Sequence, residues 1–139
     1  MVEIKTKKTA ASVADFIAAI KDPGRRKDCK TVAAIMAKAT GQRSKMWGSS
    51  IVGFGDIHVK GASREVDWFP VGFSPRKQAL TIYLGLGMGL HTAELKKLGR
   101  HKRGLGCLYL RSLDDIDLKV LKTMIVKTVK SKGGVYSGK

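Results

Sequence analysis

The sequence predicts an α+β domain, in which a mainly antiparallel sheet of about five strands carries N-terminal and C-terminal helices on one face. Three observations support this fold class. Both ends of the chain carry apolar residues at helical spacing, whereas the middle consists of short β-prone runs that glycine interrupts. The turns between these runs have the length of hairpin connections, which favours antiparallel pairing.

Two helices are predicted near the N-terminus. The first begins at Ser12, which forms a capping-box-like start with Asp15. The second begins after Asp22, with Pro23 at its first helical position, and ends at Gly41. Each carries one apolar face at i, i+3, i+4 and i+7 spacing: Val13, Phe16, Ile17 and Ile20 in the first helix, and Cys29, Val32, Ala33 and Met36 in the second.

The central strands are predicted at residues 51–54, 57–59, 67–73 and 79–84. Pro70 lies inside the third run and lacks a backbone N–H, so it indicates an edge strand or a bulge there. A short helix at Thr92–Leu98 and a strand at Cys107–Leu110 follow. A last helix is predicted at about residues 114–130, because aspartates precede it, lysines end it and an apolar stripe runs along it.

The chain has 139 residues, which suits one domain, and its 27 Lys and Arg against 11 Asp and Glu give a net charge of +16. Residues 46–90 contribute only four basic and three acidic side chains, so the charge lies mainly at the two ends. Such a surface favours weak, salt-sensitive contact with polyanions such as nucleic acid, but we favour a solvated basic surface over a dedicated nucleic-acid site as the explanation of the charge.

Cysteine content and hydropathy indicate where the protein acts. No apolar run is long enough to cross a membrane, and residues 1–8 do not resemble a secretory signal. Two cysteines, Cys29 and Cys107, form no C-x-x-C pair, so we expect reduced thiols in a cytoplasmic protein without membrane contact. Because Cys107 opens an apolar strand, we expect it to be a small buried side chain.

The order of motifs between residues 46 and 118 resembles that of the YdhG-like family, a domain of unknown function. The motifs are Met46-Trp47-Gly48, Ile51-Val52-Gly53-Phe54-Gly55, Asp67-Trp68-Phe69, Gly72-Phe73-Ser74-Pro75-Arg76-Lys77, Leu80-Thr81-Ile82-Tyr83-Leu84, Leu98-Gly99-Arg100-His101-Lys102, Cys107-Leu108-Tyr109-Leu110 and Asp115-Ile116-Asp117-Leu118. The resemblance implies a single YdhG-like domain at residues 12–130. The basic composition of residues 1–11, which lack apolar periodicity, predicts a flexible lead-in, and residues 131–139 are predicted to form a flexible tail.

Two basic segments form the predicted binding site. After Ser74, Pro75 presets a tight turn from which Arg76 and Lys77 project. Residues 99–106 form a loop in which glycines bracket four basic or imidazole side chains, an arrangement that suits phosphate or carboxylate. The resemblance implies that Lys102 of this loop matters, whereas Leu105 stands where the family often carries a second lysine. We expect Arg76, Lys77 and Lys102 to converge on one anion.

Aromatic side chains near these segments have two interpretations. Trp47, Phe54 and Trp68 are predicted ligand-site residues, since Gly53 beside Phe54 indicates a close backbone approach at a pocket rim. Residues of this kind are more often core, where two tryptophans suffice to anchor helix against sheet.

The sequence shows no catalytic residues, no metal-ligand spacing among its histidines and cysteines, and no cofactor motif. We therefore expect a non-enzymatic binding domain for a small anionic ligand or an acidic partner. One alternative, which the resemblance implies, is a frataxin-like iron chaperone; hard iron prefers clustered carboxylates, which this chain lacks. A second alternative is a basic nucleic-acid-associated module. The ligand's identity and the oligomeric state stay open at this point.

Overall fold

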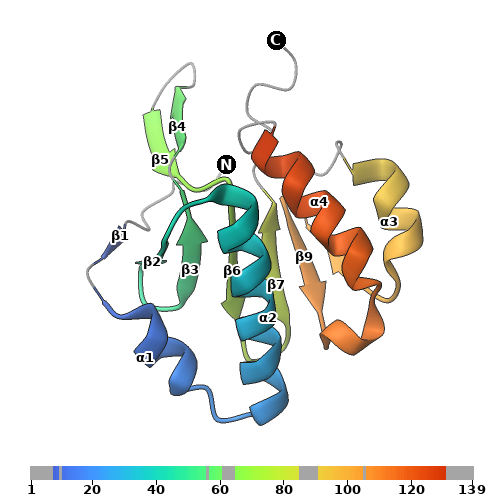
Figure 1. Ribbon diagram of the computed structural model, residues 1–139, viewed down its shortest axis with the longest axis horizontal. Helices are drawn as coiled ribbons and strands as arrows, with labels where there is room; N and C mark the ends of the chain where they lie inside the picture. Colours follow the sequence, from blue (N-terminus) through green and yellow to red (C-terminus); the bar gives the residue numbers. More distant parts are fainter. Residues whose placement is uncertain are drawn as a thin grey trace.

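The computed structural model describes residues 8–9, 11–55, 57–60, 65–84, 91–104 and 106–130 (Figure 1). The predicted tail at 131–139 and most of the predicted lead-in lie outside these residues. In chain order the elements are β1 (Lys8–Thr9), α1 (Val13–Ala18), α2 (Pro23–Thr40), β2 (Ser44–Trp47), β3 (Ile51–Phe54), β4 (Ile57–Lys60), β5 (Glu65–Trp68), β6 (Val71–Pro75), β7 (Leu80–Leu84), α3 (Thr92–Leu98), β8 (Lys102–Arg103), β9 (Cys107–Leu110), a 3₁₀ turn (Leu113–Asp115) and α4 (Leu118–Lys130).

The main sheet has seven strands in the order β1-β2-β3-β6-β7-β9-β8, and every neighbouring pair is antiparallel. Strands β4 and β5 form a separate two-stranded antiparallel ribbon. The α+β prediction is therefore confirmed. The sheet is larger than expected because the short strands β1, β2 and β8 were not predicted. Lys8 and Thr9, at the end of the predicted lead-in, pair with Trp47 and Met46 of β2.

The helix starts follow from their capping residues. Ser12 accepts a hydrogen bond from the Asp15 backbone N–H at 3.1 Å, and Asp22 accepts one from the Gly24 N–H at 2.9 Å. Helix α2 ends at Gly41, which takes the left-handed conformation at φ 66°. The predicted starts of both helices and the predicted end of α2 are thus confirmed, whereas α1 ends at Ala18, before Ile20 of its predicted apolar face.

Two boundaries differ from the prediction. The run at residues 67–73 is broken at Phe69 and Pro70, since β5 ends at Trp68 and pairs with β4, whereas β6 begins at Val71 and pairs with β3. The last helix begins at Leu118 and not at Asp114, because Asp114 and Asp115 belong to the 3₁₀ turn. Asp117 instead caps α4, accepting from the Lys119 N–H at 2.9 Å.

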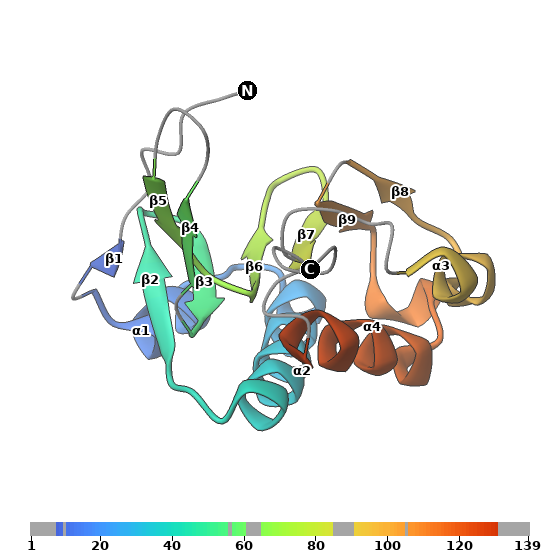
Figure 2. The same ribbon diagram turned by 90° about the horizontal axis from the view of Figure 1, so that it is seen from above.

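One face of the sheet packs against the helices and forms the main core. Figure 2 shows α2 and α4 lying on the same side of the strands. Alternate strand residues point to this side, as the period of two requires. The core includes Cys29, Val32 and Met36 from α2, Leu121, Met124 and Ile125 from α4, and Met46, Val52, Phe54, Val71, Phe73, Leu80, Ile82, Leu84, Leu108 and Leu110 from the sheet. Burial of each large apolar side chain contributes about 1.5–3 kcal/mol, so this face dominates folding.

The opposite, helix-free face carries a second apolar cluster, made of Trp47, Ile51, Trp68 and Phe69 with Tyr83 packed against it; we call it the aromatic cluster. The Phe69 ring lies over Gly53 and Gly72, which face each other across β3 and β6. A Cβ on Gly53 would approach Phe69 to 2.7 Å, and one on Gly72 would approach it to 2.6 Å. Both positions therefore need glycine. The close approach predicted at Gly53 is present, but it is made by the buried rings of the aromatic cluster and not at the rim of either pocket described below.

Histidine 91 joins the two C-terminal helices through a buried hydrogen bond. Its side chain is fully buried, and its Nε2 lies 3.0 Å from the Thr128 hydroxyl. That hydroxyl donates to the Met124 carbonyl, an arrangement that suits the His91 tautomer with its proton on Nε2. Burial lowers the pKa of His91 below its ordinary value of 6.5, an effect that Glu94 opposes and Lys127 reinforces.

We expect Gly72→Ala to destabilise the protein by about 1–3 kcal/mol, because the added methyl group meets both the Phe69 ring and the Val52 carbonyl oxygen at 2.6 Å. In thermal unfolding this should lower the Tm by roughly 3–10 °C. Gly24→Ala is the matched control: its new Cβ meets Asp22 Oδ1 at an ordinary 3.4 Å, so stability should change by less than about 1 kcal/mol. Equal effects of the two substitutions would contradict the close approach.

Acidification should destabilise the fold through His91. Because the pKa of His91 is lower in the folded state than in the unfolded state, the unfolded chain binds more protons than the folded chain as the pH falls below 6.5. The stability that is fully present above pH 6.5 is therefore lost as the pH falls from 6.5 toward the folded-state pKa. Thermal unfolding followed between about pH 7.5 and pH 5 should show this loss, which is at most about 1.4 kcal/mol per pH unit. The loss should diminish in His91→Gln and persist in His101→Gln, whose imidazole is only partly buried. An unchanged pH profile in His91→Gln would contradict this assignment.

Candidate functional site

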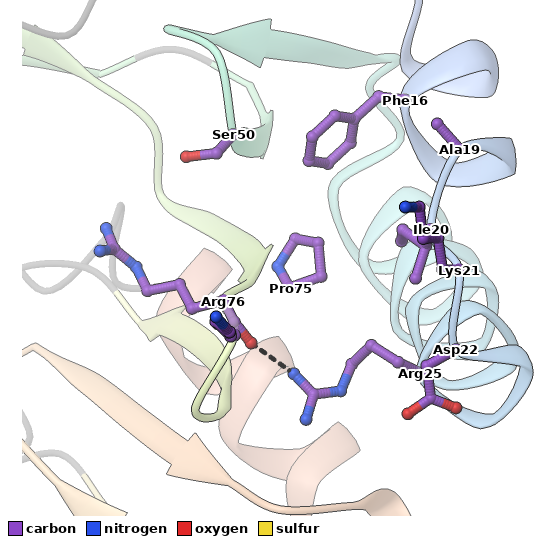
Figure 3. A pocket seen from close by; sticks show the side chains of 10 residues that line it. Phe16, Ala19, Ile20, Lys21, Asp22, Arg25, Ser50, Pro75 and Arg76 are labelled. Carbon is purple, nitrogen blue, oxygen red and sulfur yellow. Dashed lines mark hydrogen bonds between the residues drawn. The ribbon is translucent and has the colours of Figure 1, made fainter.

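The turn after β6 is fixed from several directions. Ser74 is fully buried and its hydroxyl donates to the Ser50 carbonyl at 2.7 Å. From α2, Arg25 Nη1 donates to the Arg76 carbonyl at 2.8 Å and Nη2 to the Arg111 carbonyl at 3.4 Å. Figure 3 shows the first of these bonds, with the Arg76 side chain directed away from Arg25. The backbone of the turn is thus held by α2, and its basic side chains are left for other contacts.

The Arg76 guanidinium reaches the helix-free face of the sheet. Its Nη2 donates to the Tyr83 hydroxyl at 3.0 Å, and this hydrogen bond raises the pKa of Arg76 above its ordinary value. Tyr83 is itself positioned by edge-on contacts with Phe69 and Trp68, whose ring centroids lie 5.7 and 6.3 Å away. The guanidinium is therefore a permanent cation at a position determined by the aromatic cluster.

A hollow of about 570 Å³ opens beside Arg76 on this face, and we call it the sheet hollow. It is lined by Ser50, Ser74, Pro75, Arg76, Lys77, Gln78, Ala79, Thr81 and Tyr109. Thr81 is only 2% exposed, and its hydroxyl finds no hydrogen-bond partner in the described part of the chain. Buried hydroxyls are normally paired, so Thr81 is an unusual unpaired donor and acceptor in the wall of the hollow.

Tyr109 forms the rim of the sheet hollow. Its hydroxyl accepts a hydrogen bond from Cys107 Sγ at 3.1 Å, so the ring leans along β9 toward the side chain two residues before it. The nearby Cys107 sulfur raises the pKa of Tyr109, because an ionised thiol would accept a hydrogen bond from the phenol and repel a phenolate, whereas Arg76 lowers it by a smaller amount. The phenol therefore stays neutral at physiological pH. Tyr109 is 38% exposed, which leaves much of its ring surface open.

A second hollow, of about 460 Å³, lies on the other side of the same turn, and we call it the helix hollow. It shares Ser50 and the residues from Pro75 to Lys77 with the sheet hollow. Its remaining lining comes from α1 and the start of α2: Phe16, Ala19, Ile20, Lys21, Asp22 and Arg25 (Figure 3). Its apolar wall and its carboxylate make it less suited to an anion than the sheet hollow.

The structure brings together only part of the predicted site. Ser74, Arg76 and Lys77 line the sheet hollow. Lys102 lies in β8, where it faces Tyr109, and Tyr109 faces Thr81 of β7. Lys102 is therefore on the helix-free face, like Tyr109 and Thr81. Its Cα lies about 10 Å from that of Thr81, because two strand spacings separate them. Two residues of the expected basic loop form a strand, and Leu105 lies outside the described residues.

The predicted aromatic residues do not line either hollow. Trp47 and Trp68 are buried in the aromatic cluster, at 2% and 9% exposure. Phe54 lies on the opposite, helix-covered face and belongs to the main core, so the structure separates it from the other predicted residues. Sequence reasoning missed Thr81, Tyr83 and Tyr109. Alternation along β7 and β9 could have found them, because it places these three side chains on the face opposite to that of the neighbouring leucines and isoleucine.

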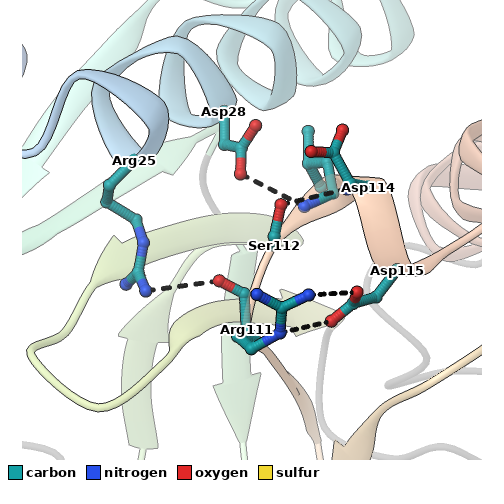
Figure 4. Close-up of polar contacts among 7 residues, drawn as sticks. Arg25, Asp28, Arg111, Ser112, Asp114 and Asp115 are labelled. Atoms are coloured by element: carbon teal, nitrogen blue, oxygen red, sulfur yellow. Dashed lines mark hydrogen bonds and ion pairs between the residues drawn. The ribbon is translucent and has the colours of Figure 1, made fainter.

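Carboxylates near the turn serve structural contacts (Figure 4). Asp28 accepts a hydrogen bond from the Leu113 N–H at 3.1 Å, which ties α2 to the 3₁₀ turn. Asp115 forms a bidentate pair with Arg111, with oxygen to nitrogen distances of 2.6 and 3.0 Å. Among the residues that the structure describes, no group of three His, Cys, Asp or Glu side chains is arranged to hold a metal ion.

Comparison of the chain with protein-family models, with characterised proteins and with solved structures gives no match. The resemblance to the YdhG-like family therefore stays a prediction based on the motifs quoted above. Within the described parts of the chain, no helix has the length and apolar character needed to span a membrane. Function has to be inferred from the geometry and charge of the two hollows.

The prediction for Cys107 is wrong, since this side chain is only partly buried on the helix-free face. Cys29, which was predicted on the apolar face of the second helix, is fully buried in the main core. Burial raises the pKa of Cys29 to about 12. Iodoacetamide at neutral pH should therefore label Cys107 in the folded protein and Cys29 only in denaturant. Mass spectrometry of Cys107→Ser should show no label before unfolding. Rapid native labelling of that variant would contradict the burial of Cys29.

Proposed function

We propose that the protein is a non-enzymatic binding domain that holds a small phosphate or carboxylate anion in the sheet hollow. The observation that carries this proposal is the position of the Arg76 guanidinium. Tyr83 orients it, and it lines the same hollow as Thr81, whose hydroxyl has no hydrogen-bond partner among the described residues. An oriented guanidinium donates two parallel hydrogen bonds to a carboxylate or phosphate, and a neighbouring hydroxyl adds a third.

Charge in the sheet hollow also supports an anionic ligand. Arg76 and Lys77 line it, and its described lining contains no carboxylate. Hydrogen bonds that involve an ionised group contribute about 1.5–3 kcal/mol each when partly shielded from water. Because Arg25 and Tyr83 already hold the Arg76 backbone and side chain, binding loses less conformational entropy than it would with a free arginine.

Binding rather than catalysis is favoured by the chemistry of the same residues. The described lining of the sheet hollow includes hydroxyls, an amide and two cations, but no histidine or carboxylate that would act as a general base. The iron-chaperone alternative gains no support from the described carboxylates, since Asp28 and Asp115 bind backbone and arginine groups. A cytoplasmic location stays part of this proposal, and it rests on the cysteine content.

Arg76→Gln should abolish the stabilisation that phosphate gives the native protein. A ligand at ten times its Kd stabilises by about 1.4 kcal/mol, which is measurable as a rise in Tm on addition of about 10 mM phosphate if the Kd is near 1 mM. The matched control is Arg43→Gln, which removes the same charge from an exposed position outside both hollows. This control should retain the full phosphate effect.

Thr81→Val separates the ligand contact from folding. Valine keeps the branched shape and removes a buried hydroxyl that lacks a partner, so stability without phosphate should be unchanged or higher. The phosphate-dependent rise in Tm should nevertheless diminish, because the anion loses one hydrogen bond. If both Arg76→Gln and Thr81→Val respond to phosphate as the unmodified protein does, the sheet hollow is not the anion site.

A further inference from the structure

Among the described residues, side chains of the aromatic cluster cover only one half of the helix-free face. The aromatic cluster lies over β2, β3 and β6, because Phe69 is seated on Gly53 and Gly72. On the other half, β9 presents Tyr109, one of two large apolar side chains that are exposed in the described residues. The Tyr109 hydroxyl is held by Cys107, and a Cβ on Gly104 would approach it to 3.0 Å, so the ring is confined along the strand.

Basic groups lie on both sides of this ring. Lys102 of β8 pairs with Tyr109 on one side, and Arg76 and Lys77 of the turn after β6 line the sheet hollow on the other side. The strand register places Lys102, Tyr109, Thr81 and Ser74 in one row across β8, β9, β7 and β6 on the helix-free face. An aromatic ring thus lies between the cation of β8 and the cations at the sheet hollow.

We propose that this row binds single-stranded nucleic acid, with one base stacked on Tyr109 and the adjoining phosphate held by Arg76 in the sheet hollow. The inference rests on the proposed function, since it identifies the anion as a backbone phosphate. Single-strand binding proteins combine a basic groove with aromatic rings on which bases stack without regard to sequence. A duplex keeps its base faces stacked internally, and an acidic peptide has no base to stack, so neither uses the Tyr109 ring in this way.

The test compares two fluorescent probes of about eight nucleotides, an oligothymidylate and an abasic strand with the same phosphates. Fluorescence anisotropy at about 50 mM salt should show that the unmodified protein binds the thymidylate at least about fivefold tighter. Tyr109→Leu should remove this preference, whereas Tyr109→Phe, which keeps the ring, should retain it. Arg76→Gln should weaken binding of both probes more than Arg43→Gln does. Binding should fall roughly tenfold to twentyfold at about 200 mM salt if three phosphates are contacted.

Several results would overturn the inference. Equal affinity for the two probes, or a base preference that survives Tyr109→Leu, would show that the ring does not stack a base. Competition by a polyglutamate peptide as strong as that by the unlabelled thymidylate would show that the face recognises charge alone. If either result is found while Arg76→Gln still abolishes the phosphate effect on Tm, the inference fails and the small-anion site stands. If phosphate does not raise the Tm of the unmodified protein, the proposed function itself is rejected.

Discussion

The contact of Phe69 with Gly53 and Gly72 is the constraint on which the rest of the helix-free face depends. A ring fits flat against a pleated sheet only where two facing residues lack side chains, and β3 and β6 provide such a pair. Phe69 then packs against Trp47 at 5.2 Å and stacks on Trp68 at 4.2 Å. The break at Pro70 makes this possible, because it ends the pairing of β5 and returns the chain to the main sheet as β6.

This contact extends to the candidate site through Tyr83. Its ring packs edge-on against Phe69, which aims the hydroxyl at the Arg76 guanidinium. From the opposite side of the turn, Arg25 of α2 binds the Arg76 carbonyl. Arg76 is therefore held by the helix layer through its backbone and by the aromatic cluster through its side chain. Both layers must be assembled before the cation is oriented, so the site is a product of the complete fold.

The high net charge does not by itself create a binding site. Eleven basic residues lie on α2, α3 and α4, mostly at exposed positions, where water and salt weaken their fields within about 8 Å at physiological ionic strength. Arg76 differs because a hydrogen bond orients it and a buried hydroxyl lies beside it. Lys102 differs because its strand is paired to β9, which places it on the face that carries Tyr109. Position, and not the number of charges, distinguishes these cations.

Local signals in the sequence determined the helices and the strand-rich centre. Ser12, Asp22 and Gly41 act through hydrogen bonds or backbone conformations within a few residues, so their roles can be read without the fold. Alternation along a strand likewise separates its residues into two groups. Alternation does not decide which of these two groups faces the helices. For this reason the sequence places Phe54 in the binding site and Cys107 in the core, whereas the structure has Phe54 in the core and Cys107 on the helix-free face.

Tertiary structure alone decided which distant segments meet. The pairing of β6 with both β3 and β7 brings Gly53, Gly72 and Tyr83 together, although Gly53 and Tyr83 lie 30 positions apart in the chain. Such long-range pairing depends on the burial of whole faces and not on local propensity. The sequence by itself therefore determined the elements and the basic turn, whereas the orientation of Arg76, its partner Tyr83 and the hollow beside Thr81 arise only when the sheet is complete.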